Sequence, residues 1–331
     1  MSGSAGTAVR VGVWGIGREG RHALEAFVAQ EGLTIAGACD ADPSRRDGLP
    51  EWIGLFSTAD ALLESADVDA VAISDEAATA DVACAVLAAG KVVILTTPVR
   101  WTLREMDALR QSATASRKAI VLLAQEALSA DFQTAEAALE RPEMGPVRHV
   151  HYALWSPPVI AGSAWSEFHA CCDRQLMRDR MLAREAGRIA ALARLIRERP
   201  VEVRCTIIAE RTREDEGFLN GGEFALDVRF ESGAAARLEV NRRTCLTHAT
   251  GWVVSGTGGG YRKGRFFQVT RDGEIFDVPQ SRPSPEADLR SRLSDAIRGI
   301  RTDCDWLLRT ATLVRAARTS AETGQAVTRL D

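Results

Sequence analysis

The chain has 331 residues, of which 46% are hydrophobic and 26% charged, with 45 acidic and 41 basic side chains. This composition is typical of a soluble globular protein and excludes a disordered, fibrous or membrane chain. The basic residues neither outnumber the acidic ones nor cluster, which argues against a nucleic-acid or membrane-surface partner. The length predicts two domains, each large enough to bury a core.

The cysteines and the first residues indicate where the protein works. Seven cysteines occur without a Cys-x-x-Cys pair, and Met1–Thr7 is small and polar, unlike the apolar stretch of a signal peptide. No apolar run approaches the ~18 residues of a membrane span. We therefore expect a reduced, cytoplasmic protein.

The chain opens with a glycine-rich turn between a strand and a helix. Val9–Trp14 is predicted to be a strand, and Gly15–Gly20 reads GIGREG before a helical pattern begins. A second predicted strand, Leu33–Cys39, ends at Asp40, which stands 20 residues after the last glycine. A strand, G-x-G-x-x-G, a helix and an acid at this distance together predict dinucleotide binding.

Each residue type in this unit has a physical task. Gly15 permits the tight turn, Gly17 lets a pyrophosphate approach, and Gly20 lets the helix lie close to the strand. Asp40 would accept hydrogen bonds from a ribose 2′-OH and repel a 2′-phosphate, which favours NAD. Arg45 could reach a 2′-phosphate, so NADP remains open. The cofactor-binding residues predicted here are Gly15, Ile16, Gly17, Arg18, Glu19, Gly20, Asp40 and Arg45.

The alternation of predicted strands and helices continues to residue 123. Strands are predicted at 70–74, 92–96 and 119–123, with helices at 82–89 and 103–116. Alternating strands and helices predict a parallel, doubly wound Rossmann sheet with its ligand above the carboxyl ends of the strands. Ser74, Asp75 and Thr96 stand at those ends, so we expect them to border the cofactor.

The second half of the chain has a different pattern. A long strand is predicted at 147–155 and a helix at 178–199, followed by strands at 201–208, 224–230, 234–241 and 252–255. Helices return at 287–300 and 305–323. Consecutive strands predict an α+β domain with a mostly antiparallel open sheet, so the domains expected are 1–124 and 125–331. The sheet face without helices suggests a homo-oligomer.

These stretches resemble the Gfo/Idh/MocA oxidoreductase family, the relatives of glucose–fructose oxidoreductase and inositol dehydrogenase. The matching segments are VGVWGIGREG, CDADPSR, DVDAVAIS, VLAAGKVVILTTP, ASRKAIVLL and SAETGQAVTRL. The resemblance is close in the first domain and loose in the second. It implies NAD(P)-dependent redox chemistry on a sugar, polyol or related small molecule.

The residues that move protons in the family are missing from this chain. Where the family carries Glu-Lys-Pro, this chain has Thr96, Thr97 and Pro98, and a threonine hydroxyl is too weak an acid or base to replace a lysine. The family's Asp-x-Gly-x-His-x-x-Asp helix best matches residues 185–192, which keep only an acid at Glu185 and the glycine. Positioned acid–base groups contribute about 10²–10⁴ in rate, so this loss should cripple ordinary alcohol oxidation.

One segment could supply replacement chemistry. Residues 165–173, WSEFHACCD, precede the helix with the family signature, and His169 would suit a general acid or base, although a polar surface loop is the plainer interpretation. Adjacent cysteines bind one ion awkwardly, so no metal site is predicted. The candidate catalytic residues are His169, Thr97 and Glu185.

Three functions therefore stay open. The first is an NAD(P)-dependent oxidoreductase with an atypical proton-transfer site. The second is a catalytically silent cofactor-binding homologue that regulates or scaffolds a partner. The third is a lyase or isomerase that uses tightly held NAD transiently.

Overall fold

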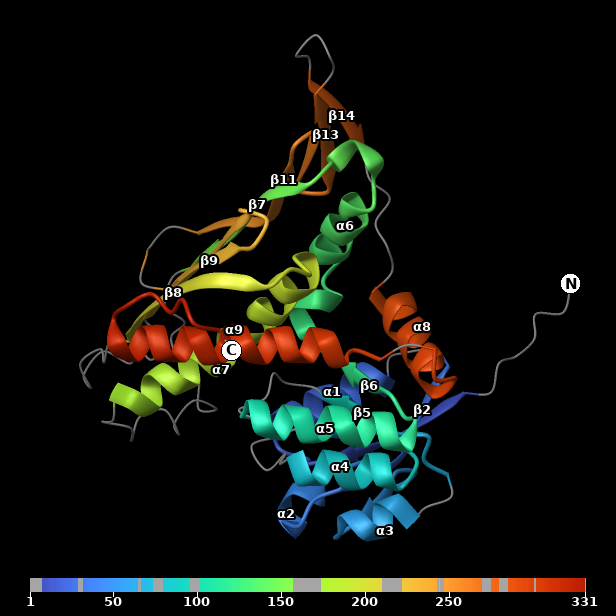
Figure 1. Ribbon diagram of the computed structural model, residues 1–331. Coiled ribbons are helices and arrows are strands. Elements are labelled where there is room, and N and C mark those ends of the chain that lie inside the picture. Colours follow the sequence, from blue (N-terminus) through green and yellow to red (C-terminus); the bar gives the residue numbers. More distant parts are fainter. Residues whose placement is uncertain are drawn as a thin grey trace, which may run out of the picture. The chain divides into compact units, whose positions relative to one another are not determined.

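A computed structural model describes residues 8–28, 32–64, 67–73, 80–95, 102–156, 174–209, 222–242, 244, 247–269, 275–279, 285–300 and 302–330. The chain forms two compact units, one of residues 1–128 and 284–311, the other of residues 129–283 and 312–331. Each unit has its own sheet (Figure 1).

The first unit holds six parallel strands in the order β3-β2-β1-β4-β5-β6. The strands are β1 (Val9–Trp14), β2 (Leu33–Cys39), β3 (Gly54–Phe56), β4 (Ala70–Ile73), β5 (Val92–Leu95) and β6 (Ile120–Leu122). The helices are α1 (Arg18–Val28), α2 (Pro43–Arg46), α3 (Ala59–Glu64), α4 (Ala80–Ala88), α5 (Leu103–Ser116) and α8 (Pro285–Ile297), with a 3₁₀ turn η1 (Gln125–Leu128).

Both faces of this sheet are buried under helices. Every residue of β4, β5 and β6 is buried, as expected for parallel strands covered on both sides. On one face, alternate strand residues such as Val13 and Ile94 share an apolar cluster with Phe27 of α1 and Leu289 of α8. The opposite face meets α3, where Leu62 lies against Gly12 of β1.

The outer edge of β6 is covered by the chain just before α9 (Cys304–Thr323). The N–H of Asp303 donates to the carbonyl of Ile120 at 2.7 Å, and the N–H of Ile120 donates to Oγ1 of Thr302 at 3.2 Å. The N–H of Leu122 donates to the carboxylate of Asp303 at 3.0 Å. An open strand edge would expose unpaired donors and acceptors, so residues 302–303 close the sheet on this side.

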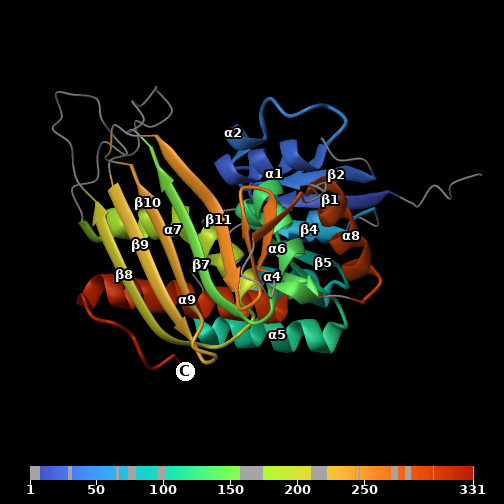
Figure 2. The same ribbon diagram turned by 90° about the horizontal axis from the view of Figure 1, so that it is seen from above.

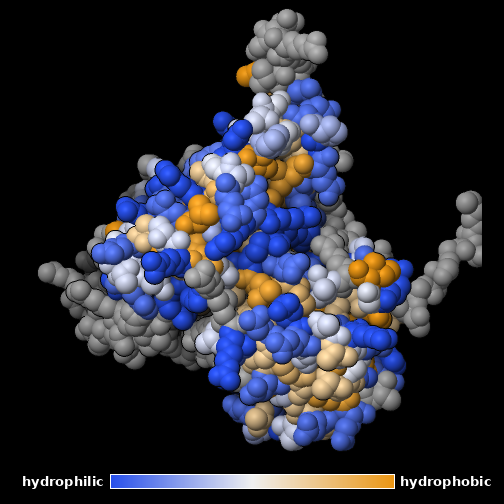
Figure 3. All heavy atoms as spheres, viewed as in Figure 1, coloured by the Kyte–Doolittle hydropathy of each residue, from blue (hydrophilic) through white to orange (hydrophobic). Residues whose placement is uncertain are grey.

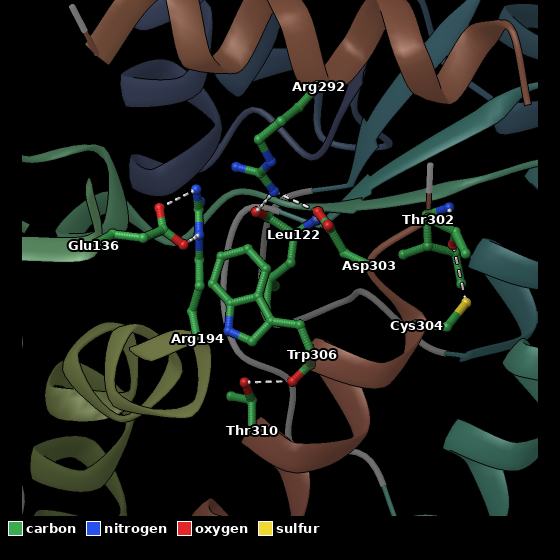
Figure 4. A network of polar contacts seen from close by, with 10 residues as sticks. Leu122, Glu136, Arg194, Arg292, Thr302, Asp303, Cys304, Trp306 and Thr310 are labelled. Carbon is green, nitrogen blue, oxygen red and sulfur yellow. Dashed lines mark hydrogen bonds and ion pairs between the residues drawn. The ribbon is translucent and has the colours of Figure 1, made fainter. Parts of the chain in front are cut away.

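A buried ion pair holds this closure in place. Nη2 of Arg292 in α8 donates to the carbonyl of Leu122 at 2.7 Å and to the carboxylate of Asp303, and the ring centroid of Trp306 lies 5.1 Å from its guanidinium carbon (Figure 4). Arg292 is 1% exposed and Asp303 6%. These contacts explain why residues 284–311 belong with the first unit, whereas the boundary expected at residue 124 placed them in the second domain.

The second unit is built on an eight-stranded sheet in the order β14-β13-β12-β11-β7-β10-β9-β8, in which only the pair β7–β10 is parallel. The strands are β7 (Val147–Trp155), β8 (Pro200–Ala209), β9 (Gly222–Phe230), β10 (Ala235–Asn241), β11 (His248–Gly256), β12 (Gly259–Arg262), β13 (Arg265–Val269) and β14 (Ile275–Pro279). The other elements are α6 (Ala130–Leu139), η2 (Pro142–Met144), α7 (Arg174–Leu195) and the second half of α9.

One face of this sheet is covered by helices of its own unit. Figure 2 shows β8, β9, β10 and β7 side by side with α7 behind them. Side chains alternate in burial along these strands, so Val150 and Tyr152 are buried while His149 and Arg237 point to the other, more exposed face. The predicted fold class, a Rossmann domain plus an α+β domain with a mostly antiparallel sheet, is therefore confirmed.

Three strands in the second unit were not predicted. Residues 257–258 join β11 to β12 within a glycine-rich stretch. Strands β12, β13 and β14 continue the sheet beyond that turn. Their sequences, GGYR, RFFQV and IFDVP, are only four or five residues long, too short for a clear hydrophobic period to be recognised.

Hydrophilic residues cover most of the face seen in Figure 3, with smaller apolar areas between them. Within the described part of the chain, no helix is both long enough and apolar enough to cross a bilayer.

A buried tyrosine gives the second unit a testable pH dependence. The hydroxyl of Tyr261 donates to Oδ1 of Asp131 at 2.8 Å and accepts from the N–H of Gly264 at 3.0 Å. Burial, together with the bond to Asp131, raises the pKa of Tyr261 above its ordinary value. Replacing Tyr261 with phenylalanine should therefore lower the free energy of unfolding by about 1–2 kcal/mol at pH 7.

The sign of the pH effect follows from the raised pKa. The folded state favours the neutral phenol, so its stabilisation is complete below pH 10 and is lost as the pH rises toward the folded-state pKa. The gap between wild type and Tyr261→Phe should thus narrow above pH 10, measured by urea unfolding followed by circular dichroism at pH 7 and 10.5. A gap of constant size would contradict the assignment.

Candidate functional site

The turn between β1 and α1 has the geometry that its glycines predict. Gly15 has φ +85°, a conformation that favours glycine, and its N–H donates to the carbonyl of Cys39 at 2.8 Å. Helix α1 begins at Arg18, and its first described main-chain bond runs from the N–H of Arg21 to the carbonyl of Gly17. The first N–H groups of a helix have no acceptor within it, so this turn offers donors to an anion.

Asp40 links the turn to the end of β2. It is 8% exposed, and its Oδ2 accepts from the N–H of Ile16 at 2.8 Å. Its Oδ1 accepts from the N–H of Asp42 at 2.9 Å. The carboxylate is thereby held beside the glycine turn, where a carboxylate oxygen can accept a further hydrogen bond from a ribose hydroxyl.

A short basic segment lies next to Asp40. Nη1 of Arg45 in α2 lies 3.7 Å from Oδ2 of Asp40, and its Nε lies 3.7 Å from Oδ2 of Asp42. Arg21 of α1 donates to the carbonyls of Arg45 and Asp47 at 2.8 and 3.1 Å. Arg21 was not predicted from the sequence, because its role is to fix the backbone of a segment 24 residues away.

Two ionisable groups at this site have perturbed acidity. Hydrogen bonds from the side chain and N–H of Ser44 lower the pKa of Asp42, which caps α2. Burial raises the pKa of the Cys39 thiol to about 11, with the charge of Asp40 adding to the effect. Cys39 is therefore a protonated, apolar neighbour of the site and an inert one.

The predicted site residues divide into three groups. The structure brings Gly15, Ile16, Gly17, Gly20, Asp40 and Arg45 to one place in the first unit, and α1 includes Arg18 and Glu19, whose side chains lie outside the described residues. Ser74, Asp75, Thr96, Thr97 and His169 lie outside the described residues. Glu185 lies in the second unit.

Glu185 is engaged by arginines. It sits on α7 at 2% exposure, and its carboxylate accepts a hydrogen bond from Arg188 and lies 3.5 Å from Nη2 of Arg242. The sequence did not identify either arginine as a site residue. A carboxylate held between two guanidinium groups is poorly placed to exchange a proton with a substrate, since both oxygens already have cationic partners.

Among the residues that the structure describes, no group of three or more His, Cys, Asp or Glu side chains is arranged to hold a metal ion. His149 and His151 lie together on the exposed face of β7 with ring centroids 6.4 Å apart.

Comparison with known proteins links the first unit to one family. Residues 9–124 match the family model described as "Oxidoreductase family, NAD-binding Rossmann fold". No curated protein matches the chain in sequence.

Solved structures share the fold along nearly the whole chain. A myo-inositol 2-dehydrogenase from Lactobacillus plantarum is 16% identical with a TM-score of 0.71, and the match covers 97% of this chain and 99% of that one. An oxidoreductase from Agrobacterium radiobacter, solved with NAD+, L-tartaric acid and magnesium, is 18% identical with a TM-score of 0.72 over 97% and 98%. An NAD-binding protein from Listeria innocua is 17% identical with a TM-score of 0.71 over 98% of both chains.

Proposed function

Because residues 9–124 are the NAD-binding Rossmann domain of the Gfo/Idh/MocA oxidoreductase family, we propose that the protein is an NAD(P)-dependent oxidoreductase acting on a sugar, polyol or related small molecule. The observation that carries the proposal is the carboxylate of Asp40, held by the N–H of Ile16 at the mouth of the glycine turn. NAD is the preferred cofactor, because a buried carboxylate there accepts from a ribose hydroxyl and repels a 2′-phosphate.

The chain's own groups would hold the cofactor in a simple way. The N–H groups of Gly17 and of the first turn of α1 would donate to the pyrophosphate, and Gly15 keeps the turn tight enough for this approach. Asp40, held by the N–H of Ile16, would accept from the adenosine ribose and orient it. The bound nicotinamide supplies hydride transfer, so the protein's remaining tasks are to position the substrate and to handle its proton.

The proton-transfer group is proposed from the sequence alone. Thr97 and His169 remain predictions, and Glu185 forms ion pairs with Arg188 and Arg242. We favour His169, because an imidazole titrates near neutral pH and a threonine hydroxyl does not.

The test combines binding and turnover. Calorimetric titration should show saturable NAD+ and NADH binding, tighter than that of NADP+ and NADPH. A panel of sugars, polyols and hydroxy acids with NAD+ should then contain a substrate, detected by NADH formation at 340 nm. His169→Ala should lower the rate of NADH formation about 100-fold or more. Absence of binding by either nucleotide would remove the proposal, and unchanged turnover in His169→Ala would remove His169 alone.

One observation favours a second candidate, a catalytically silent cofactor-binding protein. Of the three predicted catalytic residues, the one that the structure describes, Glu185, is buried in an ion-paired cluster. A protein that binds NAD+ and NADH tightly but reduces NAD+ with no member of the panel would fit that function.

The exposed face of the second sheet is proposed as a homo-oligomer surface. Its described residues include His149, Arg237 and Glu239, and Arg237 pairs with both Asp227 and Glu239. Gel filtration or light scattering should then give a mass at least twice the 35.8 kDa of one chain. The cytoplasmic location remains a prediction from the sequence.

A further inference from the structure

Helix α2 has no apolar anchor in the first unit. It is only four residues long, Pro43–Arg46, and none of its side chains is buried. A helix this short has little stability of its own, and helices in proteins owe most of their stability to the burial of an apolar face. Polar contacts therefore have to fix the place of α2.

Arg21 of α1 supplies two of these contacts. Its Nη2 donates to the carbonyl of Arg45 at 2.8 Å and to the carbonyl of Asp47 at 3.1 Å. The first carbonyl belongs to the last turn of α2 and the second to its C-cap, where carbonyls have no donor within the helix. One guanidinium group thereby ties the end of α2 to α1, the helix that follows the glycine turn.

The segment held by Arg21 provides two of the contacts of Asp40. The N–H of Asp42, at the N-cap of α2, donates to Oδ1 of Asp40 at 2.9 Å. The guanidinium of Arg45 lies 3.7 Å from Oδ2 of the same carboxylate. Another contact, from the N–H of Ile16 to Oδ2 at 2.8 Å, comes from the glycine turn. The orientation of this carboxylate therefore depends on α2 as well as on the turn.

We propose that Arg21 is a positioning residue for recognition of the adenosine ribose: by tying α2 to α1, it holds Asp40 in the orientation that accepts a hydrogen bond from the 2′-hydroxyl. This role rests on the proposed function, because it requires a bound nucleotide. Arg21 acts through α2 and not by contact with the ligand. Its contribution is preorganisation, since apparent affinity falls in proportion to the fraction of molecules that hold the binding conformation.

The same contacts predict which ligands the loss of Arg21 affects. Without its two hydrogen bonds, the N–H of Asp42 and the guanidinium of Arg45 leave their places beside Asp40 in a larger fraction of molecules. Only ligands with a 2′-hydroxyl should be affected, because the pyrophosphate would be bound by N–H groups of the glycine turn and of α1. A general loss of stability would instead weaken the binding of all nucleotides alike.

Calorimetric titration of the full-length protein with ADP and with 2′-deoxy-ADP tests this role. Wild type should bind ADP more tightly than 2′-deoxy-ADP. Arg21→Ala should weaken ADP binding about 10-fold, as expected if about a tenth of the molecules hold the binding conformation, and should change 2′-deoxy-ADP binding less than about 2-fold. Arg21→Lys keeps a cationic donor without the planar guanidinium, so its ADP affinity should fall between wild type and Arg21→Ala.

The matched control is Arg10→Ala. Arg10 stands near the start of β1, the end of the strand away from the glycine turn, and contacts Asp67 at 2.7 Å and Asp69 at 3.6 Å. This variant also removes an arginine with two partners, yet it should leave the binding of both nucleotides unchanged. Hydrogen exchange without nucleotide gives a second measurement, in which the amides of residues 42–45 should exchange about 10-fold faster in Arg21→Ala and at the wild-type rate in Arg10→Ala.

The outcomes separate the role of Arg21 from the proposed function. A loss of affinity confined to ADP in Arg21→Ala, with partial recovery in Arg21→Lys, supports the positioning role. An equal loss for both nucleotides, no loss for either, or equal binding of the two by wild type overturns it and leaves the proposed oxidoreductase standing. Wild type that binds neither ADP nor NAD overturns both proposals. If Arg21→Ala fails to fold, the same comparison of ADP with 2′-deoxy-ADP in Arg21→Lys decides.

Discussion

Replacing Asp303 with asparagine is expected to lower the free energy of unfolding by about 3–5 kcal/mol. The substitution leaves the guanidinium of Arg292, 1% exposed, without its carboxylate partner, and weakens the bond from the N–H of Leu122. Removing one partner of a buried pair costs the desolvation of the other, which surface pairs do not incur. Thermal unfolding and urea titration followed by circular dichroism would measure the loss.

Two further variants separate burial from charge. Asp295 of α8 and Arg298, just after the helix, form a more exposed pair, so Asp295→Asn should cost less than about 1 kcal/mol. The double variant Arg292→Met with Asp303→Leu should recover much of the lost stability, because it removes both charges together. Similar losses for Asp303→Asn and Asp295→Asn would refute the role given to the buried pair.

Replacing Asp40 with alanine is expected to weaken NAD binding about 10- to 100-fold. The variant loses the acceptor for the ribose hydroxyl and also the group that holds the N–H of Ile16 in the glycine turn. Because the repulsion of a 2′-phosphate disappears as well, NADP binding should be unchanged or improved. Calorimetric titration of both nucleotides would measure the shift in preference.

The neighbouring Asp42 provides the control for this experiment. It caps α2 by accepting from the N–H of Ser44 at 2.9 Å and is far more exposed than Asp40. Asp42→Ala should leave NAD binding within about 3-fold of wild type. An equal loss of affinity in both variants would show that general negative charge in this segment, and not the anchored carboxylate of Asp40, determines binding.

The fold was predictable where sequence signals are local. The apolar runs of β1, β2, β4, β5 and β6 are short and continuous because both faces of a parallel sheet are buried. The helix predicted at 178–199 is found as α7, residues 174–195, where Leu182, Ala186 and Ile189 form a buried apolar stripe. What could not be predicted was the return of α8 to the first unit, because the contact of Arg292 with Leu122 joins residues 170 positions apart.

The candidate sites likewise divide into features that the local sequence predicts and features that depend on contacts between distant segments. The glycine turn and Asp40 lie within one strand–helix–strand unit, so spacing alone indicates their meeting. The pairing of Glu185 on α7 with Arg242, just after β10, joins two segments 57 positions apart, so no local pattern of the sequence indicates it.

The covering of β6 by residues 302–303 has a consequence for synthesis on the ribosome. The Rossmann sheet emerges early, yet the segment that seals its last strand and the apolar side of α8 that completes its core are translated more than 150 residues later. Until then the nascent domain exposes the unpaired backbone groups of β6 to neighbouring chains. A fragment ending near residue 128 should accordingly be prone to aggregation, and adding residues 284–311 in trans should rescue its solubility.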